Sequence, residues 1–242
     1  MLTLFWLRLK KLSNILRDPF LTSALIKGAA AGTEHTEVLQ SLVCECIVDV
    51  GANRGQSALI ARKVFPNALI HSFEPLEEPA RVFRTIFGND SKVKLYPYAI
   101  GREKTTATLH VTKDDDSSSI LPVSQTQSAI FPGAAEVEAR EVTVLPLSEA
   151  LDAVSLPAAS LLKIDVQGFE LEVLQGSEDI LDKFSHLYIE CSFVELYKGQ
   201  ALAHEIIAWL AQRGFVLSGI HNLYYEHGRA IQGDFLFSKK EK

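Results

Sequence analysis

The stretch IVDVGANRGQS, residues 47–57, decides how this 242-residue chain folds. Its apolar start predicts a buried strand with one carboxylate, Asp49, near the end. Gly51 and Gly55 predict a tight turn, and the residues that follow have the composition of a helix. Strand, glycine turn and helix form the first half of a βαβ nucleotide-binding unit. The glycines let the backbone approach a ligand closely, and the helix N-terminus offers it free N–H groups.

The spacing of the two glycines indicates which ligand this turn suits. The pattern is Gly51-x-x-x-Gly55, and Asn53 stands where a dinucleotide fingerprint has its middle glycine. A pyrophosphate needs the close approach that this glycine permits, whereas the amino-acid end of S-adenosylmethionine (SAM) does not. The turn therefore favours SAM over a dinucleotide.

Two further apolar runs end in acids. Residues 68–73 precede Glu74, and residues 161–164 precede Asp165 and a second glycine turn. An acid in the position of Glu74 accepts hydrogen bonds from both ribose hydroxyls of a bound nucleoside, or caps the following segment. Pro75 ends the strand before it.

Together these motifs resemble the FkbM family of SAM-dependent methyltransferases. The matching segments, between residues 47 and 193, are VDVGANRGQS, HSFEP, VTVLPLSEAL, LLKIDVQGFELEVLQGSEDIL and LYIECSF. The resemblance implies an α/β, Rossmann-like class I fold, SAM as cofactor, and O-methylation of sugars, glycans or other hydroxylated natural products. It also implies a set of cofactor-binding residues, which are Asp49, Gly51, Ala52, Asn53, Gly55, Gln56, Ser57, Glu74, Pro75 and Asp165.

Composition agrees with one enzyme-sized α/β domain. The chain is 47% hydrophobic, enough for a single large core. Its net charge of −6 argues against a nucleic-acid partner, since such binders concentrate positive charge. The three cysteines are an odd number without CxxC spacing, so we expect reduced, buried thiols in a cytoplasmic protein. We assign no metal ligand.

The first 44 residues form a helical extension before a methyltransferase domain of residues 45–242. Residues 1–17 contain apolar residues at helical spacing, with basic residues between them. This run is too interrupted to span a bilayer and has the wrong charge order for a signal peptide. It packs on its own domain, on a second copy of the chain, or peripherally on an anionic membrane. Asp18 and Pro19 then predict the start of another helix.

The end of the chain predicts how the sheet closes. Residues 215–220 and 231–237 are two strands joined by a polar turn with His221, His227 and Gly228, so they should pair antiparallel. In a Rossmann methyltransferase, the last strand inserts beside the fifth and gives a seven-stranded, mostly parallel sheet. A six-stranded parallel dehydrogenase sheet does not close in this way.

Two segments in the middle of the chain are less regular. Residues 93–100 predict a single third strand. Residues 113–133 are a long polar insertion, and we expect a lid on the substrate side rather than a loose surface loop. Its run Asp114-Asp115-Asp116 predicts a solvated turn rather than a metal site.

Methyl transfer to a hydroxyl requires a base, and four side chains are candidates. They are Asp165, Glu190, Asp234 and His221, with Asp165 and Glu190 ranked first because each ends a parallel strand. Three carboxylates in one cleft repel, which raises one pKa or recruits a cation. Lys163 points to the same face as Asp165 and either neutralises the acids or pairs with one of them.

Two other functions compete with this interpretation. One is an NAD-type Rossmann oxidoreductase, which the missing middle glycine and the terminal hairpin disfavour. The other is a SAM-fold binding or assembly module without catalysis, attached through residues 1–17. The sequence does not choose among possible methyl acceptors.

Overall fold

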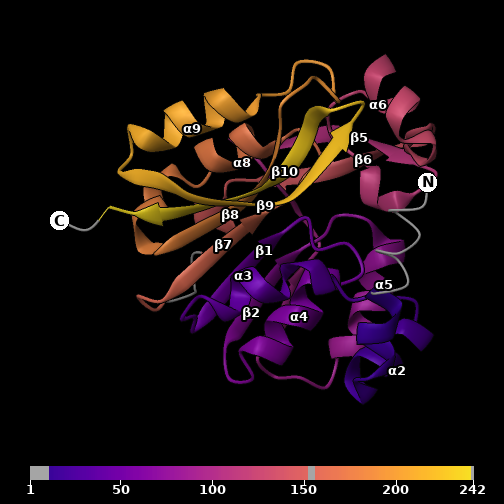
Figure 1. The fold of residues 1–242 in the computed structure, drawn as a ribbon, viewed down its shortest axis with the longest axis vertical. Helices are drawn as coiled ribbons and strands as arrows, with labels where there is room; N and C mark the ends of the chain where they lie inside the picture. Colours follow the sequence, from indigo (N-terminus) through magenta and orange to yellow (C-terminus); the bar gives the residue numbers. More distant parts are fainter. Residues whose placement is uncertain (1–10, 152–155, 241–242) are drawn as a thin grey trace.

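The structure is a computed structural model that describes residues 11–151 and 156–240 (Figure 1). Its main sheet has seven strands in the order β3-β2-β1-β7-β8-β10-β9. Their bounds are β1 Cys46–Val50, β2 Leu69–Phe73, β3 Val93–Tyr96, β7 Ser160–Ile164, β8 His186–Ser192, β9 Phe215–Glu226 and β10 Arg229–Lys239. The first five strands of that order run parallel, and β10 lies antiparallel between β8 and β9. The expected sheet with an inserted antiparallel last strand is confirmed.

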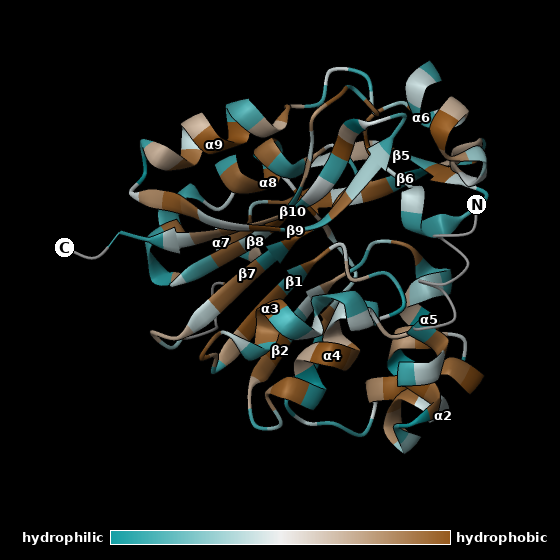
Figure 2. Ribbon diagram, in the orientation of Figure 1, coloured by the Kyte–Doolittle hydropathy of each residue, from teal (hydrophilic) through white to brown (hydrophobic). Residues whose placement is uncertain are grey.

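Helices cover both faces of this sheet, which explains why its parallel strands are mostly apolar (Figure 2). On one face, Val48 and Leu162 pack under α7 (Leu147–Ala150), α8 (Glu170–Gln175) and α9 (Ala203–Ala211). On the other face, Ile47 and Leu161 pack under α4 (Gln56–Val64), α5 (Glu77–Phe87) and the N-terminal helices. Asp49 comes two residues after Ile47 and Lys163 two residues after Leu161, so they also point to the second face.

The described part of the N-terminal extension shares this second core. Residues 11–16 are helical, and α2 (Pro19–Ile26), the 3-10 turn η1 (Thr33–His35) and α3 (Thr36–Gln40) follow. Asp18 caps α2 and Pro19 opens it, as predicted. Ile15 and Leu21 are buried in the same cluster as Ile47. Residues 1–10 of the expected amphipathic helix lie outside the described residues. None of the helices in the described ranges has the length and apolar content that a bilayer crossing requires.

A second, three-stranded sheet corrects the prediction of one strand over residues 93–100. Pro97, which has no N–H for a ladder, separates β3 from β4 (Ala99–Ile100). Strand β4 pairs parallel with β6 (Glu136–Leu145), and β6 pairs antiparallel with β5 (Thr105–Thr112). The polar insertion leaves from this sheet and contains η2 (Asp115–Ser117), α6 (Gln125–Ile130) and η3 (Pro132–Ala134).

The terminal hairpin is longer than predicted. His221 lies within β9 and not in the turn. The turn consists of His227 and Gly228, whose φ angles of 48° and 77° are those of a tight two-residue hairpin loop. An irregularity in the β9–β10 pairing, where Asn222 has φ 49°, displaces the side chains near Asp234 from simple alternation.

Two loops meet at the carboxyl edge of the parallel strands. A side chain on Gly51, which has φ 80°, would put its Cβ 1.8 Å from the backbone oxygen of Asp165, so only glycine fits there. The loop after β7 is fixed by Glu170, whose Oε1 accepts the N–H groups of Val166 at 3.2 Å and Gly168 at 3.0 Å. The turns after β1 and β7 are therefore built against each other.

The shared core predicts a large difference between two neighbouring substitutions in the extension. Ile15 is 1% exposed and Leu16 is 58% exposed. Ile15→Ala should lower the free energy of unfolding by about 2–5 kcal/mol, because it leaves a cavity against the domain. Leu16→Ala should change it by less than about 0.5 kcal/mol. Urea unfolding of both variants measures this, and equal effects would mean that the extension does not share the core.

Glu170 predicts a pH-dependent stability term. Burial raises the pKa of Glu170 to about 7, so the folded protein resists its ionisation more than the unfolded chain does. Ionisation therefore costs stability as the pH rises from about 4.5 to 7. Glu170→Gln keeps Oε1 for both N–H groups and removes this cost. The variant should gain about 2–4 kcal/mol relative to the parent chain between pH 4.5 and pH 8.

Urea unfolding at several pH values measures that gain. Glu103→Gln is the control, because Glu103 is exposed in a turn. If the difference between the Glu170→Gln variant and the parent stays constant with pH, the burial of an ionisable Glu170 is wrong.

Candidate active site

Two cavities lie at the carboxyl ends of the parallel strands. The smaller has a volume of about 70 Å³ and the larger a volume of about 290 Å³. They share a wall, whose residues are Gly51, Asn53, Asp116, Asp165 and Gln167. The glycine turn after β1 and the loop after β7 therefore stand between the two cavities, where an open α/β sheet binds its ligands.

The smaller cavity has mostly apolar walls and one buried acid. Its apolar lining includes Phe73, Leu76, Tyr98, Ile100, Leu109, Ile120 and Phe169, and Pro75 lines it too. Glu74 is 6% exposed and accepts the backbone N–H of Asn53 at 2.9 Å and that of Leu76 at 2.7 Å. Burial raises the pKa of Glu74 to about 7. Glu74 thus caps the local backbone and also faces the cavity.

The glycine turn contributes to the larger cavity unevenly. Ala52, Gln56 and Ser57 line it, with Gln56 at the start of α4. Gly55 lines neither cavity, because it lies against Phe83 and Phe87, where a Cβ would meet ring atoms at 2.8–2.9 Å. Its φ of 92° makes the turn into α4 possible, so its part in the site is structural.

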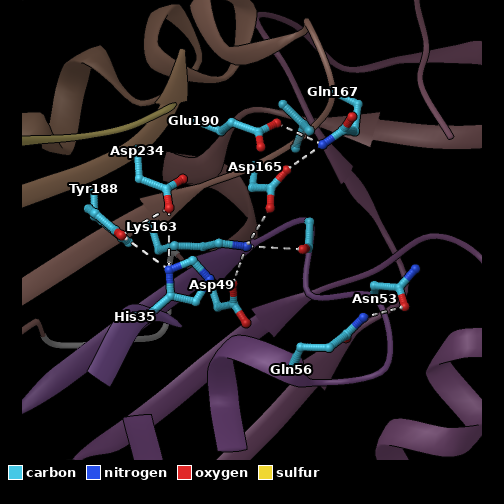
Figure 3. A network of polar contacts seen from close by, with 12 residues as sticks. His35, Asp49, Asn53, Gln56, Lys163, Asp165, Gln167, Tyr188, Glu190 and Asp234 are labelled. Carbon is cyan, nitrogen blue, oxygen red and sulfur yellow. Dashed lines mark hydrogen bonds and ion pairs between the residues drawn. The ribbon is translucent and has the colours of Figure 1, made fainter. Parts of the chain in front are cut away.

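A buried ammonium ion connects the two loops (Figure 3). Lys163 Nζ lies 3.1 Å from Asp49 Oδ1 and 3.6 Å from Asp165 Oδ2, and it donates a hydrogen bond of 3.3 Å to the Gly51 carbonyl. Burial opposes the charge, but Asp49 and Asp165 raise the pKa of Lys163. Lys163 thus contacts both acids. Asp49 is 1% exposed, stands behind Lys163, and lines neither of the two cavities.

One amide bridges the two acids at the ends of β7 and β8. Gln167 Nε2 donates to Asp165 Oδ1 at 2.7 Å and to Glu190 Oε2 at 2.8 Å (Figure 3). Gln232 Nε2 donates to the other oxygen of Glu190 at 2.9 Å. Burial, followed by the charges of Asp165 and Asp234, raises the pKa of Glu190 well above its usual value.

The other two candidate bases lie outside the cavities. The strand register places Asp234 opposite Glu190 and His221 opposite Asp234. The Asp234 carboxylate accepts hydrogen bonds from Asn222 Nδ2 at 2.7 Å and from the Tyr188 hydroxyl at 3.0 Å. His35 Nδ1 lies 3.4 Å from it. Burial opposes its ionisation, but these contacts lower the pKa of Asp234. Neither Asp234 nor His221 lines either cavity.

The acids are balanced by nearby donors. Within residues 11–151 and 156–240, no group of three or more His, Cys, Asp or Glu side chains has the arrangement of a metal site. Side-chain amides, the Tyr188 hydroxyl, His35 and Lys163 approach these carboxylates instead.

Several site residues carried no usable signal in the sequence. His35 comes from the N-terminal extension and lines the larger cavity, although nothing in its local pattern distinguishes it. From the insertion, Asp116 lines both cavities, and Gln127 and Phe131 line the larger one. The prediction that the three aspartates form a solvated turn is wrong for Asp115, which pairs with Arg54 at 2.5 Å and accepts from Asn53 at 3.3 Å.

Comparison with known proteins finds methyltransferases that are similar to most of the chain. The methyltransferase FkbM domain matches residues 49–217. The chain is 28% identical to 2-O-methyltransferase NoeI of Sinorhizobium fredii over 201 residues, which cover 78% of this chain and 77% of that protein. It is 30% identical to Methyltransferase 1 of Beauveria bassiana over 146 residues, 55% of this chain and 58% of that protein.

A solved structure is similar in fold alone. TehB from Haemophilus influenzae superposes with a TM-score of 0.50 and 8% identity, over 87% of this chain and 63% of that one. The family match decides against the two competing functions, an NAD-type oxidoreductase and a non-catalytic module. The chain belongs to the FkbM family of methyltransferases, and its methyl donor is S-adenosylmethionine.

Proposed function

We propose that the chain methylates a hydroxyl oxygen of a sugar, a glycan or another polyhydroxylated natural product. The observation that carries this proposal is the larger cavity, where Asp165 and Glu190 stand beside the glycine turn. Its walls are rich in groups that bind hydroxyls, namely Gln127, Gln167, Gln232, Glu34 and Glu190, and Phe131 adds one apolar ring. NoeI, to which the chain is similar, is named a 2-O-methyltransferase, and this supports an oxygen acceptor.

The residues at the smaller cavity fit the nucleoside part of the donor. Its apolar walls suit an adenine ring, and Glu74 is placed to accept hydrogen bonds from ribose hydroxyls. Ala52 in the glycine turn and Gln56 and Ser57 at the start of α4 face the larger cavity, where the amino-acid end would lie. S-adenosylmethionine supplies, when bound, a methyl group already activated by its sulfonium sulfur. The chain then has to align the acceptor and remove a proton.

We assign the proton transfer to the pair formed by Asp165 and Glu190. Asp165 lines both cavities, and Glu190 lines the larger one. A raised pKa makes Glu190 a stronger base than an ordinary carboxylate, which is what an alcohol acceptor requires. Asp234 fits this role less well, because its lowered pKa makes it a weaker base. It also already accepts hydrogen bonds from Asn222 and Tyr188.

The setting of the protein is inferred from its surface and its thiols. A net charge of −6 supports a small-molecule or glycan acceptor over nucleic acid. Cys44, Cys46 and Cys191 are free thiols, which supports a cytoplasmic location. Contact of residues 1–17 with a membrane surface or with a second copy of the chain stays a prediction.

Removing Glu74 tests the donor site. Glu74→Ala should weaken binding of S-adenosylhomocysteine by about 100-fold or more. It removes two hydrogen bonds to a charged group, each worth about 1.5–3 kcal/mol. Isothermal titration calorimetry measures the affinity, and Glu77→Ala on exposed α5 is the control. Unchanged affinity in a folded Glu74→Ala variant contradicts the assignment.

The same residue predicts a pH dependence. Hydrogen bonds from ribose hydroxyls stabilise the carboxylate, so binding must lower the pKa of Glu74 from about 7. The affinity for S-adenosylhomocysteine should therefore fall as the pH drops below about 7. The Glu74→Ala variant should lack this dependence in calorimetry at pH 6 and pH 8.

Amide substitutions test the base. Glu190→Gln and Asp165→Asn keep the size of each side chain and remove its basicity. We expect the affinity for S-adenosylhomocysteine to change by less than about threefold. Turnover should fall by about 10²–10⁴-fold in the variant that has lost the base. Transfer of a labelled methyl group from the donor to a hydroxylated acceptor pool measures turnover.

Ser57→Ala changes the part of the same cavity where the methyl donor would bind. It should lower the affinity for S-adenosylhomocysteine, unlike the two amide substitutions. If Glu190→Gln and Asp165→Asn both retain full turnover, neither acid is the base.

A further inference from the structure

Gln167 occupies an unusual place between the two acids. Its backbone has φ 57°, a left-handed conformation that is uncommon for a residue other than glycine. Its amide nitrogen donates to Asp165 and Glu190 at once. Carboxylates only accept hydrogen bonds, so the acids determine that the nitrogen end faces them. They do not determine how firmly the amide stays there.

The opposite end of this amide meets a buried tyrosine. The Tyr197 hydroxyl donates to Gln167 Oε1 at 2.9 Å, and the tyrosine is 1% exposed. A Cβ on Gly168 would lie 2.9 Å from Tyr197 Cβ, so the loop after β7 packs directly against this residue. Tyr197 is therefore close-packed with the turn that carries Gln167.

The same hydroxyl reaches the polar insertion. Gln127 Nε2 on α6 donates to it at 3.1 Å, and the Ser117 carbonyl in η2 lies 2.9 Å away. Gln127 is 3% exposed. The loop after β7 and two parts of the insertion thus meet at one phenol oxygen, and Gln167, Gln127 and Ser117 all line the larger cavity.

We propose that Tyr197 is a positioning residue of the methyl-transfer site, whose hydroxyl holds the Gln167 amide between Asp165 and Glu190. The amide donates to the acids, and Tyr197 keeps it there. Through Gln127 Nε2, which donates to the same phenol oxygen, the insertion supports this arrangement. The kinetic consequence rests on the proposed role of the two acids in proton transfer.

The electrostatic setting of Glu190 makes the amide important. The titratable groups whose charges interact with Glu190 are Asp165, Asp234, Glu170, Lys163, Tyr197 and Cys191. Among these groups Lys163 is the cation, and it already contacts Asp49 and Asp165. The ionised form of Glu190 therefore depends on the N–H donors of Gln167 and Gln232. Losing the Gln167 bond should raise the pKa of Glu190 further.

Tyr197→Phe tests this in the full-length chain without any acceptor. The protein is labelled with ¹³C at the glutamate carboxyl carbons, and the Glu190 signal is the one absent from Glu190→Gln. We expect Tyr197→Phe to raise the pKa of Glu190 by about 1–2 in an NMR titration. Tyr96→Phe is the matched control, since the Tyr96 hydroxyl bonds to His71 and not to the acids. An unchanged pKa in Tyr197→Phe overturns the proposal.

A double-mutant cycle shows whether Tyr197 acts through the Gln167 amide or by stabilising the surrounding structure in general. Gln167→Met removes the amide, so Tyr197→Phe should add nothing to the pKa of Glu190 in that background. Additive shifts overturn the proposal. If Tyr197→Phe does not fold, Gln127→Met supplies the test: it should give a smaller rise in the same direction, and no rise contradicts the proposal.

Turnover then distinguishes this inference from the proposed function. If Glu190 is the base, the acid limb of kcat against pH should move upward with its pKa in Tyr197→Phe, and S-adenosylhomocysteine affinity should stay within about twofold. A shifted pKa with an unshifted limb would mean that Tyr197 positions the acids and that the base has been misassigned.

Discussion

The buried ammonium of Lys163 is the interaction on which the site depends. Removing a charge from water costs several kcal/mol, and a buried charge persists only where partners surround it. Here the partners are Asp49 on β1, the Gly51 carbonyl in the glycine turn, and Asp165 after β7. Satisfying Lys163 therefore fixes the turn and the candidate base relative to each other. This fixed spacing is the kind of preorganisation that alignment of two reactants requires.

The N-terminal extension and the polar insertion complete the site at the carboxyl edge of the parallel strands. The face that carries Asp49 and Lys163 is closed by the N-terminal extension, whose His35 reaches Tyr188 at 3.1 Å and Asp234 at 3.4 Å. The insertion lines both cavities and is attached to the glycine turn through Asp115 and Arg54. Residues of the extension and of the insertion both line the larger cavity. Acceptor choice is expected to depend on them.

The sequence predicted those features that depend on short-range patterns. β1, its glycine turn, Glu74 and Asp165 were found because an apolar run, a turn residue and an acid are adjacent in the chain. The pairing of Asp115 with Arg54 was missed because it joins residues 61 positions apart, and no local pattern specifies it. The position of His221 was wrong because the length of a hairpin strand depends on cross-strand pairing more than on its own residues. The bonds of Gln167 likewise follow from the tertiary fold.

A crystal structure with bound S-adenosylhomocysteine would show whether the two cavities form one methyl-transfer site joined at Asp165. We expect the ribose hydroxyls to lie within hydrogen-bonding distance of Glu74 and the adenine ring to lie in the smaller cavity. The sulfur atom should lie at the wall that both cavities share, facing the larger one. An adenosine bound outside the smaller cavity, or a sulfur atom facing away from Asp165 and Glu190, would contradict it.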